Sequence, residues 1–161
     1  MSAWNMNDGS ALTGTHTFTN GSAVVNGNAS AVYKSEVKIG DVVTSAGGES
    51  LRVKDLSPAR TVATSGVNAS TNVVTFTAHG YTDGTEVTYN AGGGTVMGGL
   101  SDGGKFFIRD KADDTFKLAA TSGGSAIDIT GTGNNAQNFV GETNTGMTMT
   151  SNMSGSTESS V

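Results

Sequence analysis

The stretch of residues 73–118 constrains the fold of this chain more than any other part of the sequence. It contains four short runs rich in β-branched and aromatic residues, at positions 73–77, 85–89, 105–109 and 115–118. Turn-forming glycine, aspartate or asparagine residues follow the runs. Short apolar runs separated by turn residues are typical of an antiparallel meander. The stretch therefore predicts an all-β fold.

Length and composition indicate two small units rather than one large one. The chain has 161 residues, of which 24 are glycine and one is proline, and only 14% are charged. A unit of about 60 to 80 residues can bury a modest core. We therefore expect two antiparallel β-sandwich or barrel-like units, at residues 15–64 and 65–140. Extended arms are expected to flank them, at residues 1–14 and 141–161.

The first expected unit opens with a hairpin signal. Residues 15–19 and 23–26 alternate in polarity, and Asn20-Gly21 lies between them. Pro58 is expected to end the last run of this unit, because proline cannot donate a hydrogen bond to a sheet ladder.

The apolar residues of the second unit predict its core. Phe106 and Phe107 are neighbours in one run, so their side chains should point to opposite faces of the sheet. One of them must then meet another layer or a partner. The expected core residues are Phe76, Val87, Tyr89, Phe107, Ile108, Phe116 and Leu118.

The two ends of the chain are polar, with few large apolar side chains. Trp4 and Met6 lie at one end, and Met147 and Met149 at the other. A frayed N-terminus and a flexible C-terminal tail are the simplest interpretations. The alternative is that these four side chains bind a partner, with residues 147–149 as part of a strand added to a neighbour.

Composition argues against several functional classes. The net charge of -5, with scattered basic residues, does not suit nucleic-acid binding. The absence of cysteine excludes disulfides and thiolate chemistry. No run approaches the roughly 20 apolar residues that span a bilayer, so no membrane association is expected. The first eight residues have no apolar core, so no export signal is expected.

No group of residues suggests catalysis, a cofactor or a metal. His16 and His79 each lack a second metal ligand nearby in sequence. The glycines at residues 92–94 are not followed by the lysine of a phosphate loop. The aspartates of residues 110–114 lack the glycine and glutamate positions of a calcium loop. We therefore expect a protein that is not an enzyme, with no catalytic, cofactor-binding or metal-binding residues.

The motif Thr-Ala-His-Gly-Tyr-Thr-Asp-Gly-Thr-Glu-Val-Thr-Tyr and the runs that follow it resemble a β module of structural proteins of tailed bacteriophages. Residues 19–25 and 37–43 in the first unit resemble a second phage-associated module. The resemblance implies a structural role in the virion without catalytic residues. The residues that carry the first resemblance are 77–89, 98–103, 106–108, 115–119 and 127–131.

Within that class we expect a capsid decoration or cement subunit, present in several copies in the particle and held by its arms to phage capsid or tail proteins. A tail or neck component is the alternative within the class. A glycan-binding adhesion module is the alternative from another class, and it would use Tyr81, Tyr89 or Trp4 as stacking surfaces for sugars.

Overall fold

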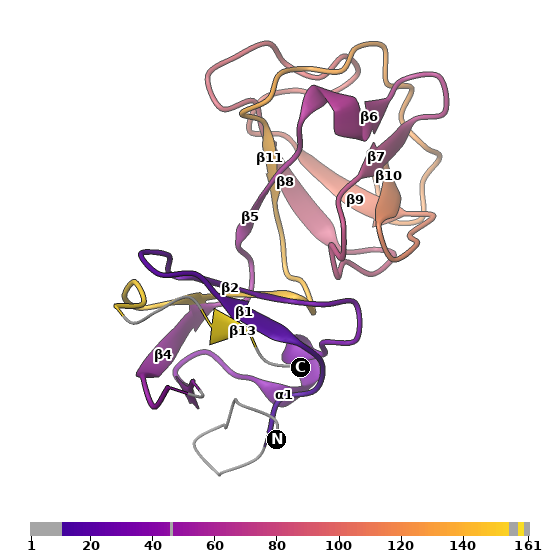
Figure 1. Cartoon of the computed structure of the whole chain (residues 1–161). Helices are drawn as coiled ribbons and strands as arrows, with labels where there is room; N and C mark the ends of the chain where they lie inside the picture. Colours follow the sequence, from indigo (N-terminus) through magenta and orange to yellow (C-terminus); the bar gives the residue numbers. More distant parts are fainter. Residues whose placement is uncertain (1–10, 46, 155–157, 160–161) are drawn as a thin grey trace. The chain divides into compact units, whose positions relative to one another are not determined.

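The computed structural model describes residues 11–45, 47–154 and 158–159 (Figure 1). Within these residues, short strands dominate, with one four-residue helix and one 3-10 turn. The strands form two antiparallel sheets, which confirms the predicted all-β class. The chain divides into unit 1, Met1–Pro58 with Thr143–Val161, and unit 2, Ala59–Glu142.

Unit 1 contains a six-stranded sheet in the order β13-β1-β2-β12-β4-β3. Every pairing in it is antiparallel. The short helix α1 (Tyr33–Glu36) lies between β2 and β3 in the sequence. The strands are β1 (His16–Phe18), β2 (Val24–Gly27), β3 (Val42–Thr44), β4 (Ser50–Asp55), β12 (Gly146–Met149) and β13 (Glu158–Ser159).

The C-terminal segment supplies a central strand of unit 1, which differs from the expected arm at residues 141–161. β12 pairs with β2 on one side and with β4 on the other. Met147 and Met149 enter the core of unit 1 beside Val25 and Val53. The alternation Met-Thr-Met is that of a strand. The groove that receives it, however, is formed by residues far away in the sequence, so local composition could not reveal it.

The N-terminal boundary also differs from the expected one at residue 14. Leu12 is buried in the core of unit 1. The backbone N–H of Thr13 donates a hydrogen bond to Glu36 Oε2, at 2.9 Å. Residues 11–14 therefore belong to the folded unit, and an N-terminal arm can include only the residues before them.

Unit 2 contains a seven-stranded sheet in the order β5-β11-β8-β9-β10-β7-β6. It begins directly after Pro58, so residues 59–64 belong to unit 2 and not to the first unit as expected. The 3-10 turn η1 (Thr64–Gly66) leads into β6. The strands are β5 (Ala59–Thr61), β6 (Val67–Asn68), β7 (Val73–Thr75), β8 (Glu86–Asn90), β9 (Lys105–Arg109), β10 (Thr115–Ala119) and β11 (Asn138–Val140).

In the sequence, unit 2 is inserted between β4 and β12 of unit 1. The segment that leads from unit 1 to unit 2 and the segment that returns contact each other within each unit. In unit 1, the N–H of Thr143 donates to the carbonyl of Leu56, at 3.0 Å. In unit 2, Val140 pairs with Ala59 at the start of the β5–β11 ladder. The outgoing and returning segments are therefore neighbours where they leave each unit.

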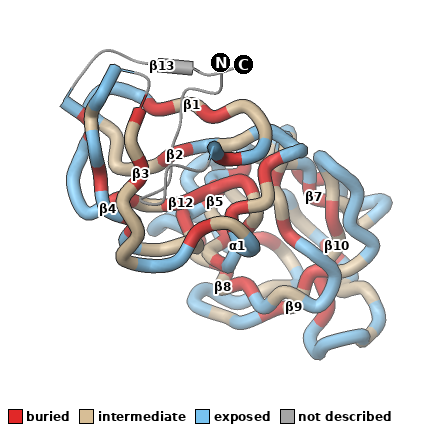
Figure 2. The backbone as a smooth tube through the Cα atoms, turned by 90° about the horizontal axis from the view of Figure 1, so that it is seen from below, coloured by how far each residue is buried: buried red, intermediate tan, exposed pale blue. Residues whose placement is uncertain are grey.

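The core of unit 2 follows the alternation expected of strands with one buried face, and Figure 2 marks the buried positions. Val87, Tyr89, Ile108, Phe116 and Leu118 are buried as predicted. Phe76 is partly buried against this core. The prediction for Phe107 is wrong, because its neighbour Phe106 is the buried residue and Phe107 lies on the opposite face of β9.

We predict that Phe116→Ala destabilises unit 2 by about 3 to 5 kcal/mol, because it removes a fully buried ring from a close-packed core. Phe107→Ala is the matched control, since Phe107 is only half-buried, and it should cost less than about 1 kcal/mol. Urea unfolding measures both changes. Equal losses for the two variants would contradict the assigned faces of β9.

We predict that Met147→Ala destabilises unit 1 by about 2 to 5 kcal/mol, because the shortened side chain on β12 leaves a cavity between β2 and β4. Hydrogen exchange should become faster in both flanking strands, while the amides of unit 2 serve as an internal reference. Thr148→Ala, on the less buried face of the same strand, is the control. Unchanged protection of β2 and β4 would show that the segment is not a structural strand.

Candidate functional site

The histidine of the His-Gly-Tyr motif is an internal hydrogen-bonding residue of unit 2. His79 is buried, and its Nδ1 accepts the N–H of Tyr81 at 3.0 Å. Nε2 must therefore carry the proton, and it lies 2.8 Å from the carbonyl of Ala112 and 3.2 Å from that of Thr115. Both ring nitrogens are engaged by backbone groups, so His79 joins the segment after β7 to the turn between β9 and β10.

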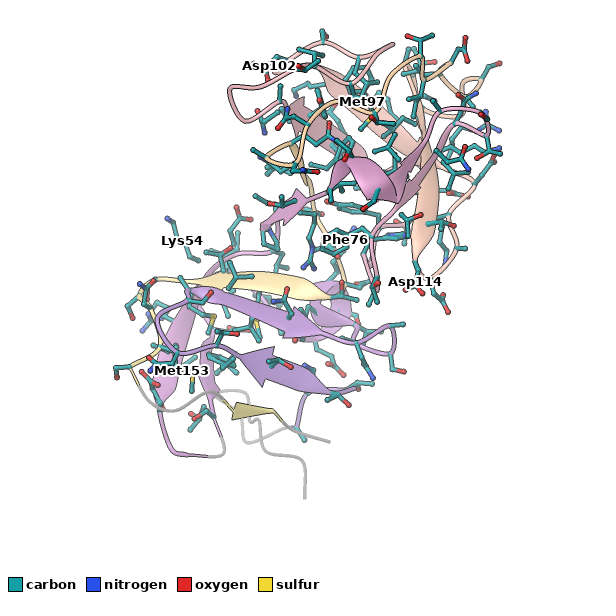
Figure 3. All side chains as sticks on the ribbon, turned by 45° about the horizontal axis from the view of Figure 1, so that its top comes forward. Lys54, Phe76, Met97, Asp102, Asp114 and Met153 are labelled. Atoms are coloured by element: carbon teal, nitrogen blue, oxygen red, sulfur yellow. The ribbon has the colours of Figure 1, made fainter. Side chains whose placement is uncertain are left out.

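The same turn binds the residues that precede His79. Ala78 has a positive φ of 50°, and its N–H donates to Asp114 Oδ1 at 2.8 Å. The N–H of Phe76 donates to the carbonyl of Asp114, also at 2.8 Å. Figure 3 shows Phe76 and Asp114 at one end of unit 2, with Met97 and Asp102 at the other end. Asp114 therefore acts as a structural acceptor and is not a free carboxylate.

His16 has a similar role in unit 1. It is buried, and its Nδ1 lies 2.6 Å from the hydroxyl of Tyr33, over which its ring stacks. Burial lowers the pKa of His16 and, by the same cause, that of His79. Both imidazoles are thus held neutral at neutral pH inside their units, and neither presents a nitrogen to solvent.

The glycine-rich connection between β8 and β9 packs its backbone against residues 134–137. A Cβ on Gly92 would lie 2.4 Å from the carbonyl oxygen of Ala136. The side chain of Asn134 donates to the carbonyls of Ala91 and Thr95, at 2.7 and 2.8 Å. Glycine is required at residue 92 for this close approach, because the space for a side chain is taken. The connection is therefore a fixed structural loop.

A buried polar network holds the far end of the same loop. The Tyr89 hydroxyl donates to Gln137 Oε1 at 2.9 Å and accepts the N–H of Met97 at 2.8 Å. Gln137 donates in turn to the carbonyl of Thr132, at 2.9 Å. Because the members satisfy one another, the network fixes the loop relative to the sheet of unit 2.

The acidic residues around the β9–β10 turn bind neighbouring groups of the protein. Asp110 contacts Arg109 at 3.1 Å and Lys117 at 3.5 Å. The hydrogen bond from Arg109 lowers the pKa of Asp110. Asp83 Oδ1 accepts the N–H of Lys111, at 3.0 Å.

Residues 11–45, 47–154 and 158–159 contain neither a metal-binding cluster nor a membrane-spanning helix. No group of three or more histidine, cysteine, aspartate or glutamate side chains there is arranged to hold a metal ion. In the same ranges, no helix has the length and apolar character needed to cross a bilayer.

The tyrosines proposed as sugar-stacking surfaces lie in the core of unit 2. Tyr81 is 2% exposed and Tyr89 is fully buried. Tyr81 packs edge-on against Phe116, with ring centroids 5.6 Å apart. The prediction that these two rings could face a glycan is therefore wrong. Trp4, the third residue of that proposal, lies outside the described residues.

The four residues expected to bind a partner fall into two groups. Met147 and Met149 are buried in the core of unit 1, so the structure gives them an internal role. Trp4 and Met6 lie outside the described residues.

The exposed apolar side chains of the described residues are better candidates for contact with a partner. Ile39 is 70% exposed and Val96 is 37% exposed. Ile39 lies in the turn that leads into β3, and Val96 lies in the fixed loop before β9. Sequence reasoning missed Ile39, because an isoleucine beside a valine-rich run is normally assigned to the core.

Comparison with known proteins adds no assignment. No protein-family model matches the chain, and no significant match is found among curated proteins or solved structures.

We predict that unit 2 loses stability as the pH falls below about 6.5, the usual pKa of histidine. His79 has a lowered pKa in the fold. Below pH 6.5 the unfolded chain therefore binds a proton more readily than the folded chain, and protonation favours unfolding. Above that pH, the full contribution of His79 to the stability of unit 2 is present.

Thermal unfolding of unit 2 at pH 7.5 and 5.5 measures this effect. His79→Gln should be less stable at pH 7.5 and should lose less stability between the two pH values. His16→Gln, in unit 1, is the control and should leave the pH response of unit 2 unchanged. A pH response of unit 2 that survives His79→Gln would assign it to another group.

Proposed function

We propose that the protein is a non-enzymatic structural subunit of a tailed-bacteriophage particle, and specifically a decoration or cement subunit that binds and stabilises the head shell. The resemblance of residues 77–89 and 98–103 to phage β modules is the starting point. Capsid proteins, and further copies of this chain in the same particle, are its proposed partners.

The observation that carries the proposal is the internal use of the motif residues. His79 and Tyr81 are buried, and Asp83 holds the backbone of Lys111. The two aromatic rings of the motif therefore serve as internal packing and hydrogen-bonding groups of a scaffold. A scaffold of this kind suits a subunit whose function is to occupy a position in an assembly.

We further propose that residues 1–10 attach the subunit to the particle. Ordering such a segment costs about 1 to 2 kcal/mol per residue, so it needs anchoring side chains. Trp4 can bury roughly 200 Å² of surface, and Met6 can adapt to an irregular pocket. Leu12 is part of the core of unit 1, so the attachment segment ends before it.

We predict that the purified protein cosediments with heads of the phage that encodes it and does not cosediment with its purified tails. Deletion of residues 1–10 should abolish binding while both units stay folded, and Trp4→Ala should weaken it strongly. Thr61→Ala, at an exposed polar site on β5 of unit 2, is the control. Binding to tails alone would favour the tail or neck alternative, and binding to neither would refute a virion role.

A further inference from the structure

The sheet of unit 1 has an open edge at β3. At the other edge, β13 pairs with β1, whereas no strand of the described residues lies beyond β3. The carbonyl of Asp41 accepts the N–H of Val53, and the N–H of Ser45 donates to the carbonyl of Glu49, both at 2.8 Å. Because antiparallel pairing alternates along a strand, the peptide groups of residues 42 and 44 point away from β4.

Ile39 is held in an exposed position beside this edge. The N–H of Lys38 donates to Asp41 Oδ2 at 2.8 Å, and the N–H of Asp41 donates back to the carbonyl of Lys38 at 3.1 Å. Gly40, with φ of 97°, donates to the carbonyl of Val53 at 2.8 Å. The turn is therefore fixed, and it presents an exposed apolar side chain three residues before β3 begins. An uncovered edge of this kind invites association with other chains.

The described chain begins beside α1, the helix that precedes the turn into β3. Leu12 shares a core cluster with Val37 and Val43. Thr13 donates to the carboxylate of Glu36 through its N–H and its hydroxyl. Glu36 lies only two residues before Lys38, the first residue of the turn that leads into β3. Ala11, the first described residue, already takes part in a β-bridge.

The ten residues before Ala11 have the length and the pattern of an added strand. Ten residues can span about 33 Å when extended. In Trp4-Asn5-Met6-Asn7, large apolar and polar residues alternate, so a strand would present Trp4 and Met6 on one face. A five-residue strand covers about 17 Å, enough to run along β3 and reach the turn at Ile39.

We propose that residues 3–7 add to the open edge of β3 in the same chain and cover Ile39 with an apolar side chain. This is β-strand addition, in which backbone hydrogen bonds supply affinity and alternate side chains supply specificity. A short tether gives a segment an effective concentration in the millimolar range at its own site. In the free subunit, the chain's own segment therefore outcompetes a second copy.

The strand would protect the free subunit from edge-to-edge association. If residues 1–10 also attach the subunit to a particle, as proposed above, attachment requires this strand to leave β3. Only that last step rests on the proposed function. The contact itself is a property of the free protein and can be tested without particles.

Disulfide trapping tests the contact directly, because the natural chain contains no cysteine. Full-length double variants would combine Thr44→Cys with Asn5→Cys or with Met6→Cys, so that both faces of the segment are sampled. The matched controls combine the same two substitutions with Thr61→Cys. Thr61 is exposed on β5, the edge strand of unit 2.

Under mild oxidation, we expect a disulfide within one chain in at least one Thr44→Cys double variant. It should appear as a compact monomer on a non-reducing gel, at a yield about tenfold above the controls, which corresponds to about 1.4 kcal/mol of preference. Disulfides between chains would overturn the proposal in favour of a second copy. No disulfide, or equal yields with Thr61→Cys, would overturn it as well.

A second variant tests the role of Ile39. Adding Ile39→Asp should lower the yield of the intrachain disulfide several-fold, because a carboxylate replaces the apolar contact. Val96→Asp, at the other exposed apolar side chain, should leave the yield unchanged. An unchanged yield with Ile39→Asp would remove Ile39 from the contact. Loss of head binding with normal trapping would refute the proposed function alone, and normal head binding without trapping would refute this inference alone.

Discussion

The pairing of β12 with both β2 and β4 is the interaction on which the rest of unit 1 depends. β2 and β4 do not pair with each other, so without β12 the sheet would separate into two parts. Met147 and Met149 contribute to the core between those parts. Because β12 follows unit 2 in the sequence, unit 1 can be completed only after residues 59–142 have been synthesised. The fold thus couples the two ends of the chain through one central strand.

Unit 2 depends on a different kind of constraint, in which buried polar groups position its loops. His79 holds the β9–β10 turn, and the Tyr89–Gln137 pair holds the glycine-rich connection. A buried polar group that loses its partner is costly, so such networks favour a single arrangement of the loops. The histidine and the glycine-rich connection, which were considered as a metal site and a phosphate loop, are therefore parts of a rigid scaffold.

Because the buried residues of both units have structural roles, the proposed binding functions lie at a sheet edge and in a terminal segment rather than in a cleft. The open edge of β3 offers backbone groups, Ile39 offers apolar surface, and residues 1–10 offer Trp4 and Met6. These are the means by which β proteins associate through strand addition. They suit the proposed role of a subunit that binds within an assembly.

The sequence by itself determined strands β7 to β10 of unit 2 and five of its buried core residues, because alternation with period two and turn residues are local signals. It placed Phe106 and Phe107 on opposite faces, but only the registers with β8 and β10 decided that Phe106 faces inward. Tyr81 and Tyr89 could be core or surface residues from their local patterns alone. The position of β12 was decided entirely by tertiary structure, because the groove that binds Met147 and Met149 is formed by strands about a hundred residues earlier, and no local pattern records such a distant partner.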